Sequence, residues 1–395
     1  MADKTVTKAE YRKALEDCIY LCGCAVRGLL PDKCRVSKMN IILLYRASNI
    51  HLLTGAVAYA LESAGIYDRA FTQAKAKAMR KLGLMDTEMS ALFERMEQEG
   101  IWYMPLKGAV LKDYYPSYGM RQMADHDILF DETKADKVKE ILVGMGFTAE
   151  HFGAGNHDCY YKKPVCNFEM HRSLFGKGHD DKMQEYYADI KSRLIKGSVK
   201  SDMKMHSQIT TDQLDEGNEY GYHFSPEDFY VYMIAHEHKH YSISGTGIRS
   251  LLDTYVYLKK ETLDMDYVTA ETEKLGIGDF EKLNRSLSLH LFEGEKLTDE
   301  EEEMLDFVFS SGTYGTCTNR VRNTIRKNGW SKARYMLYRF SVPVSRKNKD
   351  YEAYAAAYPV FYRYKALLVI LPFYRTLRSM RERRFSVEAK AIRDA

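Results

Sequence analysis

The chain has 395 residues, of which 45% are hydrophobic and 29% are charged, a composition typical of a globular protein with a real core. The 58 Lys and Arg residues nearly balance the 55 Asp and Glu residues, so the net charge of +3 gives no strong signal for nucleic acid. The longest apolar run, "ALLVILPF" at 366–373, is far below the roughly 20 residues of a spanning helix. We therefore predict no transmembrane segment.

The N-terminal residues and the cysteines predict a cytoplasmic protein. Residues 1–17 contain no apolar segment like that of a secretory signal, and an odd number of cysteines, seven, suits reduced thiols. Cys18, Cys22, Cys24 and Cys34 cluster in a stretch with helical character. A metal cluster is conceivable, but the spacing lacks the C-x2-C pair of a zinc ribbon, so we predict buried structural thiols.

The remaining patterns predict an α+β fold, with a mixed sheet core between two helical regions. Residues 7–98 read as helices, and a short β-prone run opens at Ile101. Strands and helices then alternate to about residue 200. We expect a strand at 126–130, a helix at 132–146 that Gly146 can end, and a hairpin of 158–163 and 166–172 around Pro164.

Two capping signals place helices in the C-terminal part. Ser225 and Pro226 suit the N-cap and first position of one helix. Thr298 and Glu301 form a capping-box pattern at the start of another. We divide the chain into an N-terminal helical region (1–100), an α/β core (101–205) and a C-terminal helical region (206–395).

The segment 104–130, "MPLKGAVLKDYYPSYGMRQMADHDILF", carries the chemistry. Asp125 and Asp127 are two apart in or entering a strand, so both carboxylates should project from one face. Two neighbouring like charges are costly unless a cation lies between them, and Mg2+ prefers such oxygen ligands. If the 166–172 strand is a neighbour, Glu169 adds a third carboxylate, as in a two-metal site. A lone D-x-D is otherwise a solvated strand end.

Cationic and backbone groups nearby suit an anion. Lys107 and Gly108 stand at a strand-to-helix turn, where backbone N–H groups hold phosphates. Arg121 could add a bidentate phosphate contact.

The order of a Gly turn, D-x-D on a strand and a third acid on a strand resembles the polymerase-beta-like nucleotidyltransferase superfamily. "PLKGAVL", "RQMADHDILF", "EMHRSLF", "IRSLLD" and the C-terminal "YPVFYRYKALLVILPFYRTLR" resemble, more narrowly, a bacterial family of uncharacterised nucleotidyltransferases. The resemblance covers roughly 50–380 and is strongest at 104–175.

The resemblance implies a nucleotidyltransferase core at 101–205 and a set of functional residues. Asp125, Asp127 and Glu169 would be catalytic and bind Mg2+, with Mn2+ as an alternative. The nucleotide would be bound by Lys107, Gly108, Ala109, Arg121, His236 and His240. One departure is Ala109, where the superfamily usually has Ser or Gly, so phosphate binding would depend more on Lys107 and on backbone N–H groups.

The segment "HEHKH" at 236–240 fits H-E-x-x-H, which makes a zinc hydrolase the alternative function. Catalytic zinc needs a third protein ligand beside His236 and His240. Ile243 and Thr246 do not continue the metzincin pattern, although Glu261 follows at a tolerable distance.

The same histidines suit a nucleotide site equally well. His236 and His240 share one helix face and could bind phosphates or base, or help to deprotonate the acceptor; surface or structural histidines are the plain interpretation. Arg249 or Asp253 could orient one of them. His171 shares a strand face with Glu169 and could support it from the second shell.

These features predict transfer of a nucleoside monophosphate from an NTP, with ATP ranked first, to an unidentified acceptor with release of pyrophosphate. The acceptor could be a protein, an RNA or a small molecule. A non-catalytic protein that kept the fold and binds a nucleotide or a partner is the third interpretation. The basic stretch at 375–384 predicts a solvated final helix, with a membrane-surface or RNA-contacting patch as alternatives.

Overall fold

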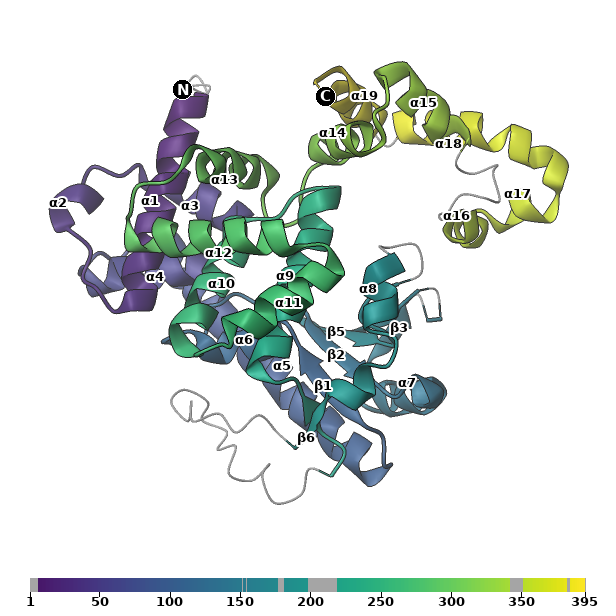
Figure 1. The fold of residues 1–395 in the computed structure, drawn as a ribbon, viewed down its shortest axis with the longest axis horizontal. Helices are drawn as coiled ribbons and strands as arrows, with labels where there is room; N and C mark the ends of the chain where they lie inside the picture. The colour runs from purple at the N-terminus through teal and green to yellow at the C-terminus, as the bar shows by residue number, and fades with distance from the viewer. Residues whose placement is uncertain are drawn as a thin grey trace.

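Helices make up the N-terminal part of the computed structural model, as the sequence predicted (Figure 1). The structure describes residues 6–150, 152–153, 155–176, 181–197, 219–341, 351–381 and 384–394. The first helices are α1 (Lys8–Arg27), α2 (Lys33–Val36), α3 (Ile41–Ile50), α4 (Thr54–Ser63) and α5 (Arg69–Gln98). α1 begins with a capping box between Thr7 and Glu10, which satisfies two N-terminal backbone donors.

The cysteine prediction is confirmed in three of four positions. Cys18, Cys22 and Cys24 are free, buried thiols on α1, and none belongs to a metal-ligand group among the described residues. Cys34 is exposed, because it lies at the start of the short helix α2, away from the core face of α1. For Cys34 the prediction was wrong.

A mixed five-stranded sheet follows, in the order β1-β2-β5-β4-β3. β2 and β5 are parallel, and the other neighbours are antiparallel. The predicted 126–130 strand and the hairpin around Pro164 are confirmed, and Pro105 is tolerated because β1 is an edge strand. The strands are β1 (Tyr103–Leu106), β2 (His126–Phe130), β3 (Thr148–Glu150), β4 (His157–Lys162) and β5 (Cys166–His171).

The two faces of this sheet have different partners. Alternate residues such as Ile128 and Phe168 point to one face and share a core with α5 and with α7 (Ala135–Gly144). The other set, which includes Asp127 and Glu169, points the opposite way, because strand side chains alternate. Leu129 on that face packs in a core with α9 (Pro226–Ile243). Function is therefore expected on the α9 side.

The C-terminal part is helical, and its predicted caps are confirmed: Ser225 caps α9 and Thr298 forms a capping box with Glu301. Short elements precede α9: α6 (Gly108–Leu111), η1 (Lys112–Tyr114), η2 (Glu132–Lys134), α8 (Asp181–Tyr186), η3 (Ile190–Arg193), β6 (Ile195–Lys196) and β7 (Tyr222–His223). The later elements are α10 (Ile248–Lys260), α11 (Met265–Leu275), α12 (Gly278–Glu293), α13 (Asp299–Ser311), α14 (Cys317–Asn328), α15 (Lys332–Ser341), α16 (Tyr351–Ala357), α17 (Pro359–Arg363), η5 (Lys365–Val369), α18 (Leu371–Arg381) and α19 (Arg384–Asp394).

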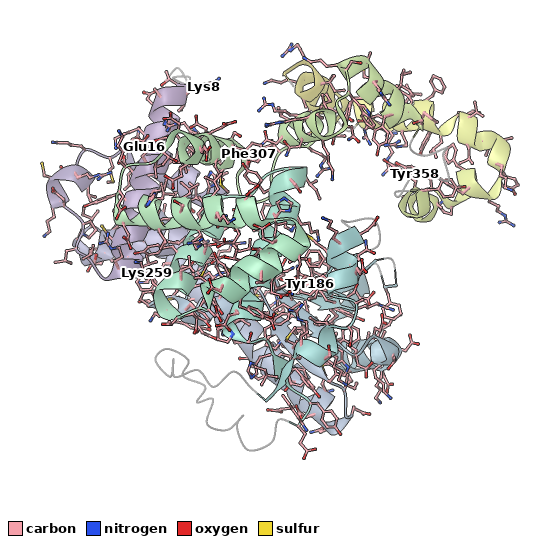
Figure 2. All side chains as sticks on the ribbon, viewed as in Figure 1. Lys8, Glu16, Tyr186, Lys259, Phe307 and Tyr358 are labelled. Atoms are coloured by element: carbon pink, nitrogen blue, oxygen red, sulfur yellow. The ribbon has the colours of Figure 1, made fainter. Side chains whose placement is uncertain are left out.

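The hydrophobic cores cross the predicted region boundaries. Leu15 and Leu44 of the N-terminal helices share one core with Leu252 of α10 and Val308 of α13. Phe307 of α13, labelled in Figure 2, contacts Tyr241 of α9 with ring centroids 4.7 Å apart.

The helices α14–α19 stand to one side of this body (Figure 1). They have a small core of their own around Val321, Tyr335 and Ala391. The chain thus forms one sheet-centred body and one smaller helical unit. Among the described helices, none has both the length and the hydropathy needed to cross a membrane.

Candidate active site

Two carboxylates lie side by side on the α9 face of the sheet. Asp127 of β2 is in register with Glu169 of β5, and both side chains point to the same face because the strands are direct neighbours. The predicted adjacency of these acids is therefore present. Asp125 precedes β2 and is partly buried.

Lys107 provides the main positive charge of the site. It occupies the turn from β1 to α6 with φ 46° and ψ −116°, a left-handed conformation that is strained for a residue with a side chain. This turn brings its Nζ to 2.6 Å from Asp127 Oδ1. His171 Nε2 lies 2.7 Å from the same oxygen. One carboxylate oxygen thus receives two nitrogen contacts.

Gly108 and Ala109 follow in the same turn. A Cβ on Gly108 would lie 2.6 Å from Arg121 Nη1 and 2.7 Å from Met123 Cε, so a larger residue here would have to displace the ends of these two side chains. Ala109 is buried and adds no hydroxyl. Lys107 is therefore the charged side chain that this turn offers to a phosphate.

The titration behaviour follows from this layout. Burial opposes ionisation of Asp127, but Lys107 and the His171 contact outweigh it and hold its pKa well below the usual range. Burial and then Asp127 raise the pKa of Asp125. Burial, Asp127 and Asp125 raise the pKa of Glu169 to about 7. The cluster therefore has more negative charge than its own cation neutralises.

The donor set suits a hard divalent cation. Ligand atoms of Asp127, Glu169 and His171 all lie within 4.8 Å of one another, and Asp125 is close enough for Asp127 to raise its pKa. A divalent ion would relieve the repulsion that raises the pKa of Glu169. Asp127 and Glu169 would hold such an ion, with Asp125 beside them.

One face of α9 lies over the carboxylates. Tyr232, His236 and Lys239 recur at helical spacing, and the Tyr232 and His236 rings are 6.2 Å apart. His240 Nε2 lies 3.2 Å from His236 Nε2, which confirms that these two histidines share a face. This face presents nitrogen and hydroxyl groups to the sheet.

The pKa shifts show how close α9 comes to the sheet. Burial, and then Lys107, lower the pKa of Lys239 to about 8. The same two causes bring the pKa of His236 well below its ordinary value, so His236 is neutral at pH 7 and a weak base. That favours a hydrogen-bonding role over deprotonation of an acceptor.

Sequence reasoning missed four groups here. Tyr232 has a buried hydroxyl with no partner among the described atoms, and with Lys239 it extends the His236 face by the same helical spacing. His157 and Cys159 face Glu169 from β4, and their ligand atoms lie within 4.8 Å of it. The strand alternation of 157, 159 and 161 was the available signal for these two.

The structure does not support the predicted phosphate contact of Arg121. Its Nε and Nη2 donate to Asp253 Oδ1 and Oδ2 at 2.7 and 2.8 Å, and both residues are buried. Tyr115 donates to the same carboxylate at 2.7 Å. The bidentate pair uses the donors that a phosphate would need, so Arg121 anchors the loop before β2 to α10.

Arg249 and Asp253 also have roles different from those expected. Asp253 pairs with Arg121, and Arg249 Nη1 donates to the Gln122 carbonyl at 3.1 Å. Neither of these contacts orients His236 or His240. Both hold the 115–125 loop, which contains Asp125 and leads into β2 with Asp127.

The H-E-x-x-H alternative loses its support. Among the described residues, no metal-ligand group includes His236 or His240. Burial raises the pKa of Glu237 to about 8, so it carries a proton at neutral pH and is a poor general base. Glu261, the candidate third ligand, accepts a hydrogen bond from Tyr114 at 2.7 Å.

A family model described as "Uncharacterised nucleotidyltransferase" matches residues 37–293. The match ends at the last residue of α12, so it spans the carboxylate pair, α9 and the Arg121–Asp253 pair. The helices α13–α19 lie beyond it. Comparisons with curated proteins and with solved structures gave no match.

Proposed function

The chain belongs to the uncharacterised nucleotidyltransferase family, and from this premise we propose that it is a Mg2+-dependent enzyme. It transfers a nucleoside monophosphate from an NTP to a hydroxyl or amine of an acceptor and releases pyrophosphate. ATP ranks first among the nucleotides. The acceptor is a protein side chain, an RNA end or a small molecule.

The observation that carries the proposal is the excess negative charge of the carboxylate pair. Asp127 and Glu169 lie in register on neighbouring strands, and their repulsion contributes to a Glu169 pKa of about 7. Such a cluster of neighbouring carboxylates is poised for a divalent ion. The ion would bring the triphosphate and polarise the reacting phosphorus.

The remaining groups have supporting roles. Lys107 lies beside Asp127, so a metal that neutralises Asp127 would release its ammonium group to a phosphate oxygen. Lys239 and His236 approach from α9 on the opposite side. The triphosphate would lie between the sheet and α9, where fixed positive groups neutralise charge that develops on the leaving pyrophosphate.

The test is calorimetric titration of ATP, GTP, CTP and UTP, each with and without Mg2+. The proteins are wild type, Asp127→Asn and the control Asp279→Asn, which changes an exposed acid on α12. We expect one nucleotide to bind only with Mg2+, and Asp127→Asn alone to lose this binding. Nucleotide binding that is equal in all three proteins, or absent from wild type, would sink the proposal.

A further inference from the structure

The helical unit α14–α19 has a charge unlike that of the rest of the chain. Residues 317–395 contain 19 Lys and Arg against 5 Asp and Glu, a net charge of +14 in a chain whose total is +3. No acidic residue occurs between positions 317 and 349. The unit lies beyond the family match and does not include the carboxylate cluster.

The helix α18 has its apolar side toward solvent. Phe373 and Leu377 are 62% and 67% exposed, and Met380 is 50% exposed. They recur at spacings of four and three residues, so they form one stripe along the helix. Arg381 is exposed next to the stripe, one turn after Leu377. A helix that packs only within its own domain buries such an apolar stripe. The exposure of the α18 stripe therefore indicates an interaction surface.

The stripe continues onto α15. The rings of Phe340 and Phe373 are 6.2 Å apart, and Leu337 nearby on α15 is 71% exposed. Ile370 extends the stripe at the start of α18. We call this surface the α15/α18 patch; it consists of Leu337, Phe340, Ile370, Phe373, Leu377 and Met380.

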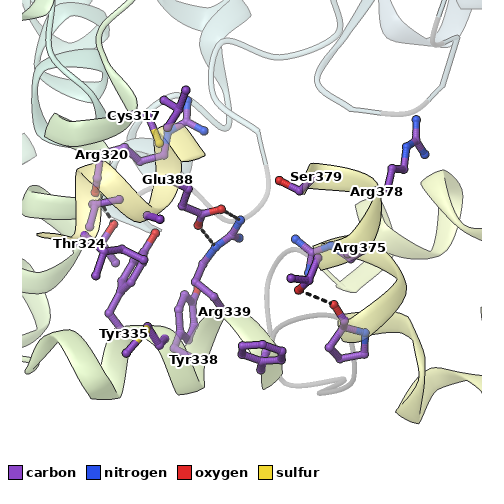
Figure 3. A pocket seen from close by; sticks show the side chains of 18 of the residues that line it. Cys317, Arg320, Thr324, Tyr335, Tyr338, Arg339, Arg375, Arg378, Ser379 and Glu388 are labelled. Carbon is purple, nitrogen blue, oxygen red and sulfur yellow. Dashed lines mark hydrogen bonds and ion pairs between the residues drawn. The ribbon is translucent and has the colours of Figure 1, made fainter. Parts of the chain in front are cut away.

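Contacts on the inner side fix the direction in which α18 faces. Arg375 donates to the Tyr354 hydroxyl at 2.9 Å, and Arg339 pairs with Glu388 of α19 at 2.7 Å. These groups line a cavity of about 1220 Å³ between the helices (Figure 3). Phe340 also borders this cavity, but Phe373, Leu377 and Met380 do not, so the apolar stripe of α18 faces away from it.

We propose that the α15/α18 patch docks on the surface of an anionic lipid bilayer. An apolar stripe flanked by arginines is the arrangement of interfacial helices, which bury their apolar side at the acyl boundary while basic groups meet lipid phosphates. The +14 charge complements an anionic surface.

Two other occupants suit the patch less well. RNA also complements the charge, but it has no counterpart for the aliphatic Leu337, Ile370 and Leu377. In a dimer formed through this patch, two units with a charge of +14 each would repel one another. The lipid surface matches both the charge and the apolar groups.

The test is co-flotation of the full chain with vesicles, either of phosphatidylcholine alone or with about a third of the lipid as anionic phosphatidylglycerol. Wild type should float with the anionic vesicles, and less so in high salt. Phe373→Ser/Leu377→Ser should reduce the bound fraction at least about tenfold, because two buried apolar side chains are lost. The control Leu30→Ser/Ile42→Ser changes residues that are 77% and 70% exposed on the N-terminal part and should bind like wild type.

A second variant, Arg381→Gln, keeps the stripe and should weaken flotation by a smaller factor. Melting followed by circular dichroism verifies that each variant is folded. Failure of wild type to float, or equal flotation of wild type and Phe373→Ser/Leu377→Ser, overturns the proposal. A dimer, or an RNA complex, that depends on Phe373 and Leu377 without any vesicle binding also overturns it.

Discussion

Two groups of buried charge lie along the same loop, and they are balanced differently. Around Arg121, the Asp253 carboxylate receives a bidentate pair and the Tyr115 hydroxyl, so its acceptors are satisfied inside the fold. Around Asp127 and Glu169, carboxylates face one another with Lys107 as the nearby cation. The two groups share the chain between residues 115 and 127.

This difference indicates that the group around Arg121 is structural and that the group around Asp127 is suited to bind a ligand. A satisfied buried pair needs nothing from outside and holds the loop in place. An unsatisfied cluster of like charge raises its own pKa values, and a ligand of opposite charge lowers its free energy. Mutations in the first group should change stability, and mutations in the second should change ligand binding and pH dependence.

The largest expected effect is that of Asp127→Asn on nucleotidyl transfer. If Asp127 holds Mg2+ as proposed, the ion would lose its central ligand, and we expect turnover to fall about a thousandfold or more. Steady-state release of pyrophosphate measures it, once an acceptor is found. Turnover near the wild-type value would show that Asp127 is not part of the active site.

Asp253→Asn should act on stability instead. It leaves the buried Arg121 guanidinium without its counter-charge, which we expect to cost about 3–5 kcal/mol of the free energy of unfolding. Urea unfolding measures the change, with the exposed Asp279→Asn as control. A loss below about 1 kcal/mol would mean that the Arg121 pair is not the anchor of the loop.

Glu169 should make the metal-free protein less stable as pH rises. Its pKa is raised from 4.5 to about 7, so the folded protein holds a proton that the unfolded chain releases. Stability from this group is therefore lost between about pH 4.5 and 7, by about 3 kcal/mol at most. Urea unfolding at pH 5 and pH 8 should show this loss in wild type and a smaller one in Glu169→Gln. The same slope in both proteins would contradict the assignment.

Lys239 should produce the smallest change. Its pKa is lowered to about 8. As pH rises through this value, the ammonium group loses its proton and its charge, so nucleotide affinity should weaken. Lys239→Ala should weaken affinity about tenfold and remove the pH dependence, whereas Lys239→Arg should keep affinity at high pH. Calorimetry at pH 7 and pH 9 decides, with the exposed Lys296→Ala as control. An unchanged affinity in Lys239→Ala would place α9 outside the nucleotide site.

The parts of this fold that could be predicted are those coded by local patterns. Alternation and turn residues predicted β2 and the β4–β5 hairpin, and from them the adjacency of Asp127 and Glu169 followed. Caps predicted the starts of α9 and α13. Tyr232 and Lys239 were within reach, because they lie on the helix face that His236 already defined.

The partner of Arg121 could not be predicted in this way. Asp253 lies 132 positions further along the chain, and no local periodicity encodes a contact between a loop and a helix so distant in sequence. From the sequence alone, Arg121, just before the D-x-D strand, was therefore predicted to bind a phosphate. The packing of α10 on the loop gives Arg121 a structural role instead.

The core that joins the N-terminal helices to α10 and α13 bears on how the chain folds during synthesis. Leu15 and Leu44 complete their packing only with Leu252 and Val308, which leave the ribosome on the order of tens of seconds later at ordinary elongation rates. During that interval the apolar faces of α1 and α3 lack their final cover. A nascent chain of this protein should therefore depend on a chaperone that binds exposed apolar segments until α13 has emerged.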